Sequence, residues 1–176
     1  LAAGDIAFLS HSLDGTDDFS FILLKDIDAS TVIKFTDKGW NDGSGFTAFT
    51  GEADWQWTSG SAQTCGTVVS ITVNAPGFIA SIGTASGTSP VHSGIGDQLF
   101  AFQGTLASPT FIAGLNSNET ATDANWNGSS TSNSTSALPD DLTNGVNAIR
   151  LHSGGLEVDN WQYNCAVVSG DVATVR

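Results

Sequence analysis

Apolar residues occur along this chain in short alternating runs that are separated by polar turns. The densest run covers residues 19–24 (FSFILL), and a second covers residues 31–35 (TVIKF). Alternation with a period of two places successive side chains on opposite faces of a strand, so these runs predict two neighbouring β-strands. No window combines a 3.6-residue apolar period with capping residues, and we therefore expect little helix.

The same pattern predicts about ten strands in all. Besides the two runs above, the expected strands are residues 5–9, 46–49, 52–58, 67–73, 97–104, 110–115, 148–151, 157–163 and 165–168, and residues 78–82 form a weaker segment. Residues 83–96 and 116–136 are rich in Gly, Ser, Thr and Asn and are predicted as long polar loops. Short strands at such intervals are typical of an all-β antiparallel β-sandwich, with a closed barrel as the alternative. We expect one domain spanning residues 1–176.

Charge restricts the classes of partner. The chain has 18 acidic and 5 basic residues, for a net charge of −13. Such a chain repels phosphate groups, which argues against nucleic acid and anionic membranes as partners. No apolar run reaches the roughly 18 residues of a membrane-spanning helix. The carboxylates either favour a bound divalent cation, Ca²⁺ above all, or only keep the protein in solution.

The best candidate for calcium is the acidic loop before the densest run. Asp14, Asp17 and Asp18 offer oxygen ligands at short spacing, and Asp37 and Asp97 lie at the ends of predicted strands from which they could complete the set. The loop lacks the full twelve-residue EF-hand pattern. The alternative is a turn in which aspartate side chains accept hydrogen bonds from nearby backbone amides.

Two cysteines, Cys65 and Cys165, are too far apart in sequence for a CxxC motif or a local metal pair. In a secreted β-protein they would form one disulfide, whereas in a cytosolic protein they would be free thiols. The chain contains no methionine and begins with Leu1, which favours a mature form whose leader has been removed. We therefore expect a secreted protein with one disulfide.

Five tryptophans are many for a chain of this length. Trp40 and Trp161 are predicted to belong to the core. Exposed rings beside Asn and Asp would suit stacking on sugars, and the candidates for this role are Trp55, Trp57 and Trp126. The alternative for these three is also the core, where large aromatic residues of β-sandwiches usually lie.

Catalytic motifs are missing from the sequence. It has neither a GxSxG elbow nor an HExxH pair, and each of its histidines, His11, His92 and His152, lies beside Ser or Gly in a predicted loop. We therefore expect exposed histidines and no enzyme, with no catalytic residues. A hydrolase that uses paired carboxylates such as Glu52, Asp54 and Glu157 stays as a third alternative.

Three Asn-x-Ser/Thr sequons lie close together, at Asn118, Asn127 and Asn133. Their clustering in one polar loop predicts a glycosylated surface if the source is a eukaryote.

Several motifs together resemble a module of large secreted and surface proteins. They are GDIAF (4–8), DDFSFILLKDI (17–27), TVIKFTDKGW (31–40), SGIGDQLFAFQG (93–104), PTFIAGLN (109–116), TSALPDDLTNGVNAIRL (135–151) and DNWQYN (159–164). The resemblance covers residues 4–164. It implies an extracellular β-sandwich, broadly like lamin-tail and immunoglobulin-like modules, and it brings no established catalytic residues.

Taken together, these observations predict a secreted, non-enzymatic structural subunit of an extracellular assembly such as a filament, sheath or surface coat, stabilised by calcium. Its expected partners are copies of itself or other extracellular proteins, joined through strand edges or terminal segments. The alternative function is a carbohydrate-binding or adhesive module, with glycans as partners.

Overall fold

The computed structural model describes residues 1–47, 49–92, 96–118, 126–151, 158 and 160–164. These residues form no helix, and the predicted all-β class is confirmed for them. None of the described segments is therefore a helix able to cross a membrane. The described strands are β1 (Ile6–Ser12), β2 (Asp18–Leu23), β3 (Val32–Thr36), β4 (Trp40–Asn41), β5 (Gly45–Phe46), β6 (Asp54–Thr58), β7 (Val68–Asn74), β8 (Gly77–Ala80), β9 (Thr84–Gly87), β10 (Gln98–Thr105), β11 (Ser108–Asn116), β12 (Ala148–Arg150) and β13 (Asn160–Gln162).

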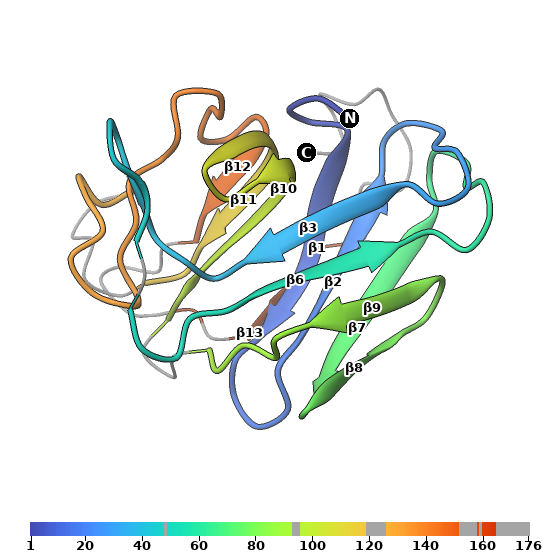
Figure 1. Ribbon diagram of the computed structural model, residues 1–176, viewed down its shortest axis with the longest axis horizontal. Coiled ribbons are helices and arrows are strands. Elements are labelled where there is room, and N and C mark those ends of the chain that lie inside the picture. The colour runs from blue at the N-terminus through green and yellow to red at the C-terminus, as the bar shows by residue number, and fades with distance from the viewer. Residues whose placement is uncertain (48, 93–95, 119–125, 152–157, 159, 165–176) are drawn as a thin grey trace.

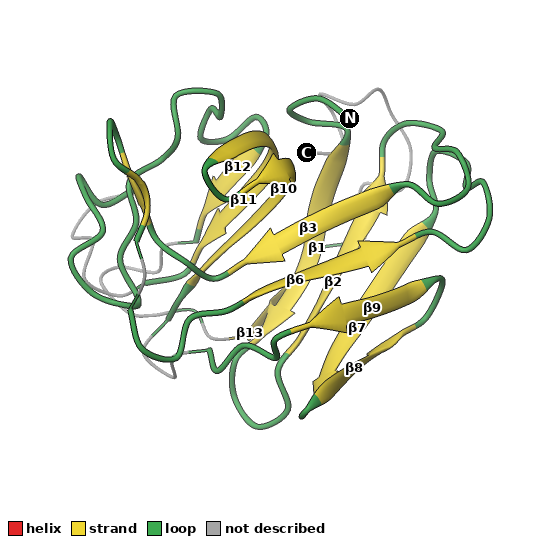
Figure 2. Ribbon diagram, viewed as in Figure 1, coloured by secondary structure: helices red, strands yellow, loops and turns green. Residues whose placement is uncertain are grey.

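Two sheets contain most of these strands. The five-stranded sheet has the order β13-β1-β2-β7-β8, and the six-stranded sheet has the order β12-β11-β10-β3-β6-β9. Figures 1 and 2 show β3, β6 and β9 in front of β1, β2, β7 and β8, so the two sheets form two layers. β4 and β5 form a separate two-stranded hairpin.

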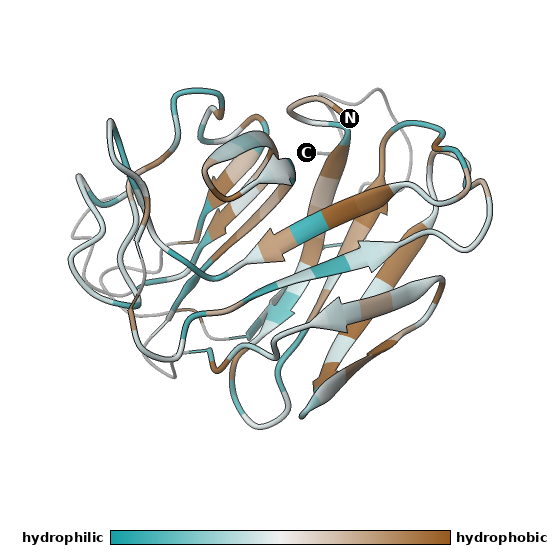
Figure 3. Ribbon diagram, viewed as in Figure 1, coloured by the Kyte–Doolittle hydropathy of each residue, from teal (hydrophilic) through white to brown (hydrophobic). Residues whose placement is uncertain are grey.

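The main core, which we call the inner cluster, lies between the two sheets. Phe8, Phe19 and Phe21 from one sheet meet Phe35 and Trp55 from the other, with ring centres 5.0–6.5 Å apart. Strand alternation places these residues on the facing sides, as the burial pattern of β3 and β6 shows. In Figure 3 the strongest hydrophobic colour lies on strands such as β2 and β3, and the loops are mostly pale or teal.

A second apolar group, the outer cluster, covers the opposite face of the six-stranded sheet. Phe100, Phe102 and Phe111 belong to it, whereas Leu99 and Ala101 of β10 belong to the inner cluster. β10 is therefore buried on both faces, which explains its continuous apolar sequence. The cover consists of loops and of the β4–β5 hairpin, which contribute Trp40, Phe46, Trp126 and Leu142, on the left of Figure 1.

The structure differs from the sequence-based expectation in four places. β1 extends to Ser12, because a bulge between Phe8 and Ser10 lets pairing with β2 continue into the predicted loop. β9 lies inside the predicted loop 83–96 and pairs with β6. A hairpin at 40–46 replaces the expected strand 46–49. β12 runs parallel to β11, which the long connection 117–147 allows.

Candidate functional site

The two long sides of the sandwich end in different ways. On one side β8 and β9, the edge strands of the two sheets, follow each other in sequence and are joined only by residues 81–83. On the other side the edge strands are β12 and β13, of three residues each. We call the latter the open side.

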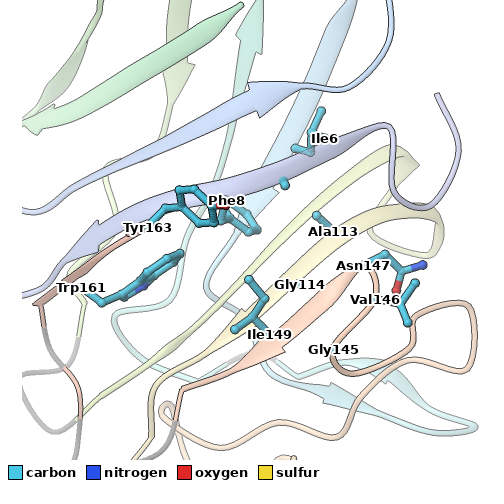
Figure 4. A pocket seen from close by; sticks show the side chains of 11 residues that line it. Ile6, Phe8, Ala113, Gly114, Gly145, Val146, Asn147, Ile149, Trp161 and Tyr163 are labelled. Atoms are coloured by element: carbon cyan, nitrogen blue, oxygen red, sulfur yellow. The ribbon is translucent and has the colours of Figure 1, made fainter. Parts of the chain in front are cut away.

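A pocket of about 260 Å³ lies on the open side, between β1 and β13 of one sheet and β11 and β12 of the other (Figure 4). Figure 4 shows Phe8, Trp161, Tyr163 and Ile149 around it, with Val146 at one end. None of the lining residues in the described part of the chain is charged; they are Ile6, Ala7, Phe8, Ala113, Gly114, Gly145, Val146, Asn147, Ile149, Trp161 and Tyr163. The pocket is thus an uncharged, mostly apolar hollow on a strongly acidic chain.

Among the described residues, only part of β1 is paired along this side. Its residues Ser10, His11 and Ser12 pair with β13, and the Tyr163 amide donates to the Leu9 carbonyl at 2.7 Å. Within the described part of the chain, no strand pairs with Ile6–Phe8 on that edge. Backbone groups of an unpaired edge can accept a further strand, so this stretch of β1 is a suitable place for strand addition.

A second unusual feature is a pair of buried histidines, and here the prediction of exposed histidines is wrong. His11 is 1% exposed and His92 is 7% exposed, and their ring centres lie 5.2 Å apart in a T-shaped arrangement. The bulge in β1 is the reason for the burial of His11, because it shifts the alternation so that His11, after Ile6 and Phe8, faces inward. Burial and the neighbouring His92 hold the pKa of His11 well below its usual value.

Two aspartates lie near His92. The Asp17 Oδ2 atom is 3.4 Å from His92 Nδ1 and 3.4 Å from the His92 backbone nitrogen. Asp37, at the end of β3, is 1% exposed and accepts a hydrogen bond of 2.6 Å from the Ala53 amide. Burial raises the pKa of Asp37 to about 6, although the Ala53 hydrogen bond and His92 act in the opposite direction.

Burial also raises the pKa of Glu52, against hydrogen bonds from the Phe49 and Gly39 amides. The Asp37 charge raises it further. Both oxygens of Glu52 are used to hold the turn before β6, which is a structural role. His152 and Glu157 lie outside the described residues.

The five aspartates predicted as calcium ligands do not form one group. Asp14 is exposed and accepts a bond from Asn160 Nδ2, Asp18 begins β2, and Asp97 is buried with its Oδ1 accepting from the Gln98 amide. Among the described residues, no three His, Cys, Asp or Glu side chains are already arranged around a common point. Burial, and after it the neighbouring Asp17, raises the pKa of Asp18. Calcium binding at these residues stays a prediction.

The three tryptophans named as candidates for sugar stacking are buried, which agrees with the alternative that placed them in the core. Trp57 is 0%, Trp55 3% and Trp126 8% exposed. Trp55 and Trp57 belong to the inner cluster, and Trp126 packs on Phe100 in the outer cluster, with ring centres 5.5 Å apart. No face of these rings is available to a sugar.

The sequons lie in different environments. Asn118 is 1% exposed, which argues against a glycan there because a glycan must extend into solvent. Asn127 is half-buried and Asn133 is exposed. Glycosylation at these two stays a prediction.

The predicted disulfide involves one residue outside the described part of the chain. Cys65 is exposed, and its amide donates to Asp26 Oδ1 at 2.7 Å. Cys165 lies outside the described residues. The disulfide therefore stays a prediction.

Comparison of the chain with family models, curated proteins and solved structures finds no match.

Proposed function

We propose that this protein is a secreted, non-enzymatic structural subunit that assembles with copies of itself through the open side. The observation that supports this most is the pocket beside Ile6–Phe8 of β1, whose described lining is uncharged and mostly apolar, together with the lack of a strand partner for Ile6–Phe8 on that edge among the described residues. An edge strand of a second copy would add its backbone hydrogen bonds to β1 and place apolar side chains in the pocket.

Charge favours this surface over other parts of the molecule. Two copies with a net charge of −13 each repel one another, so they must meet where few carboxylates face each other. The described residues that line the pocket on the open side carry no charge, which meets this condition. Assembly should then become stronger as salt screens the remaining repulsion.

The test compares two exposed apolar residues on opposite sides of the molecule. Val146 is 49% exposed at the pocket, and Ile79 is 58% exposed on β8. Sedimentation and electron microscopy of the wild-type protein should show ordered polymers. Val146→Lys should be monomeric because it brings a charge to the pocket, and Ile79→Lys should assemble like the wild type.

Two results would contradict this function. One is a wild-type protein that stays monomeric at high concentration and high salt. The other is equal assembly by Val146→Lys and Ile79→Lys, which would place the interface elsewhere. Because both changed side chains are exposed, neither variant should unfold the domain.

Calcium and a Cys65–Cys165 disulfide belong to the same proposal, as stabilising features of an extracellular subunit. Assembly that is lost in a chelator and restored by Ca²⁺ would support the first. An unreduced mass two units below that of the reduced chain would support the second. The carbohydrate-binding alternative no longer has the three aromatic rings that motivated it.

A further inference from the structure

The two buried histidines pose a question that the assembly proposal does not answer. None of the four ring nitrogens of His11 and His92 has a hydrogen-bond partner in the described part of the chain. Each neutral imidazole has one N–H donor and one acceptor nitrogen, and leaving these unpaired in a buried site is unfavourable. Buried polar atoms of this kind indicate a ligand, an ion or a water molecule that satisfies them.

Two distances around these rings match those in a tetrahedral metal centre. If two imidazoles bind one ion at bonds of about 2.0–2.1 Å, their ring centres lie roughly 5 Å apart and their ligand atoms roughly 3.3 Å apart. The His11 and His92 ring centres are 5.2 Å apart. His92 Nδ1 lies 3.4 Å from Asp17 Oδ2, which is longer than an ordinary N–H···O bond and close to the ligand spacing.

Asp17 is the third side chain near these two rings, and it is partly exposed. The Asp17 side chain is 17% exposed, whereas that of His92 is fully buried. Three such side chains are not already placed around one point in the described residues. Binding therefore requires a side-chain rotation, and Asp17, which lies in the loop before β2, is the most exposed of the three side chains.

From these observations we infer that His11, His92 and Asp17 bind a divalent transition-metal ion of the zinc type. The ion would join β1, the loop before β2 and the segment before β10 at one end of the sandwich. Two imidazole nitrogens and one carboxylate are ligands that zinc and cobalt accept, with water as the fourth ligand, whereas calcium prefers oxygen ligands alone.

The experiment is a titration of untagged, chelator-treated protein with Co²⁺, followed by visible absorption. We expect one ion per chain, with the intense bands of tetrahedral cobalt, and displacement by Zn²⁺ but not by Ca²⁺. His11→Gln and His92→Gln should abolish the bands, and Asp17→Asn should weaken binding by about 10-fold to 100-fold or more. His152→Gln is the matched control and should bind like the wild type.

When Cys65 is reduced, its exposed thiol is a competing ligand for such ions. Cys65→Ser should therefore leave the bands unchanged. The thermal midpoint of each variant in chelator shows whether it is folded, and Asp17→Asn serves as the partly exposed variant if a histidine variant does not fold.

The inference is overturned if the wild-type chain binds no Co²⁺ in this titration. It is also overturned if the folded histidine variants retain the bands, if His152→Gln loses them, or if Ca²⁺ displaces Co²⁺. The titration measures metal binding to protein in solution, so its result does not depend on whether the chains assemble.

Discussion

The inner and outer clusters are both rich in aromatic residues, yet they are built differently. The inner cluster lies between two sheets, so regular strands surround it on both sides. The outer cluster has the six-stranded sheet on one side and loops with a short hairpin on the other. A cavity between two sheets can close little because the strand ladders hold the backbones apart, whereas loops can move inward. The same aromatic residue should therefore matter more in the inner cluster.

The largest effect is expected for Phe35→Ala. Phe35 is fully buried, and its ring lies 5.0–6.5 Å from those of Phe8, Phe19, Phe21 and Trp55. The free energy of unfolding should fall by about 4–5 kcal/mol, at the upper end of the usual cost of such truncations. Urea unfolding followed by tryptophan fluorescence measures it.

Phe111→Ala is the matched variant in the outer cluster, where Phe111 is 3% exposed and contacts Trp40, Phe46 and Phe100. Its cost should be closer to about 3 kcal/mol, since the loops can partly fill the space. Equal losses for the two variants would contradict the difference between the clusters.

A smaller and pH-dependent effect is expected at Asp37, which lies where the chain leaves the inner cluster at the end of β3. Burial raises the pKa of this carboxyl from 3.8 to about 6 in the folded state. Between these values the folded state binds more protons than the unfolded state, so stability falls as pH rises from about 4 to 6. A difference of about two pKa units corresponds to roughly 3 kcal/mol.

Asp37→Asn removes this charge and keeps an oxygen that can accept from the Ala53 amide. The variant should be more stable than the wild type at pH 7 by up to about 3 kcal/mol and nearly equal to it at pH 4. Unfolding curves at the two pH values, in chelator, test this. A difference between variant and wild type that does not change with pH would contradict the assignment.

The smallest effect compares two tryptophans, one from each cluster. Trp126 Nε1 donates to Asn144 Oδ1 at 3.2 Å, whereas the buried Trp55 Nε1 has no partner among the described residues. Trp126→Phe loses a hydrogen bond and Trp55→Phe does not, while both lose similar volume. The lost hydrogen bond should add about 1 kcal/mol to the cost of Trp126→Phe and so offset the larger cavity cost of Trp55→Phe in the inner cluster, which leaves the two losses nearly equal. Denaturant midpoints at equal slope provide the comparison, and a loss for Trp55→Phe that exceeds that for Trp126→Phe by about 1 kcal/mol or more would contradict a contribution of the Trp126 hydrogen bond.

The clusters also show which features the sequence could predict. Strands such as β2, β3, β7 and β10 follow from local alternation or from continuous apolar runs, and the prediction located them to within a residue or two. The burial of His11 did not follow, because it depends on a bulge that shifts the alternation by one residue and leaves no local mark. β9 consists of Thr, Ala, Ser and Gly and is a strand only because β6 lies beside it.

The candidate site was even less predictable. Asp17 was predicted as a metal ligand because of its carboxylate oxygens. Its contact with His92 could not be predicted, because the two residues are 75 positions apart in the sequence. The open side combines β1 and β11 with two three-residue strands from the end of the described chain. The sequence also left open whether Trp55, Trp57 and Trp126 were exposed or in the core, because alternation tells which residues share a face but not which face is covered.

The loop cover of the outer cluster has a consequence for how the chain can be shortened. Phe100, Phe102 and Phe111 lie on strands whose other neighbours belong to the inner cluster, so these rings cannot be removed with the loops that cover them. A protease that released residues 126–147 would leave a sheet with an apolar surface on its outside. Such a fragment would precipitate or bind other apolar surfaces instead of persisting as a smaller domain. The smallest stable unit therefore includes the loops that cover the outer cluster, which act as a third layer on the two sheets.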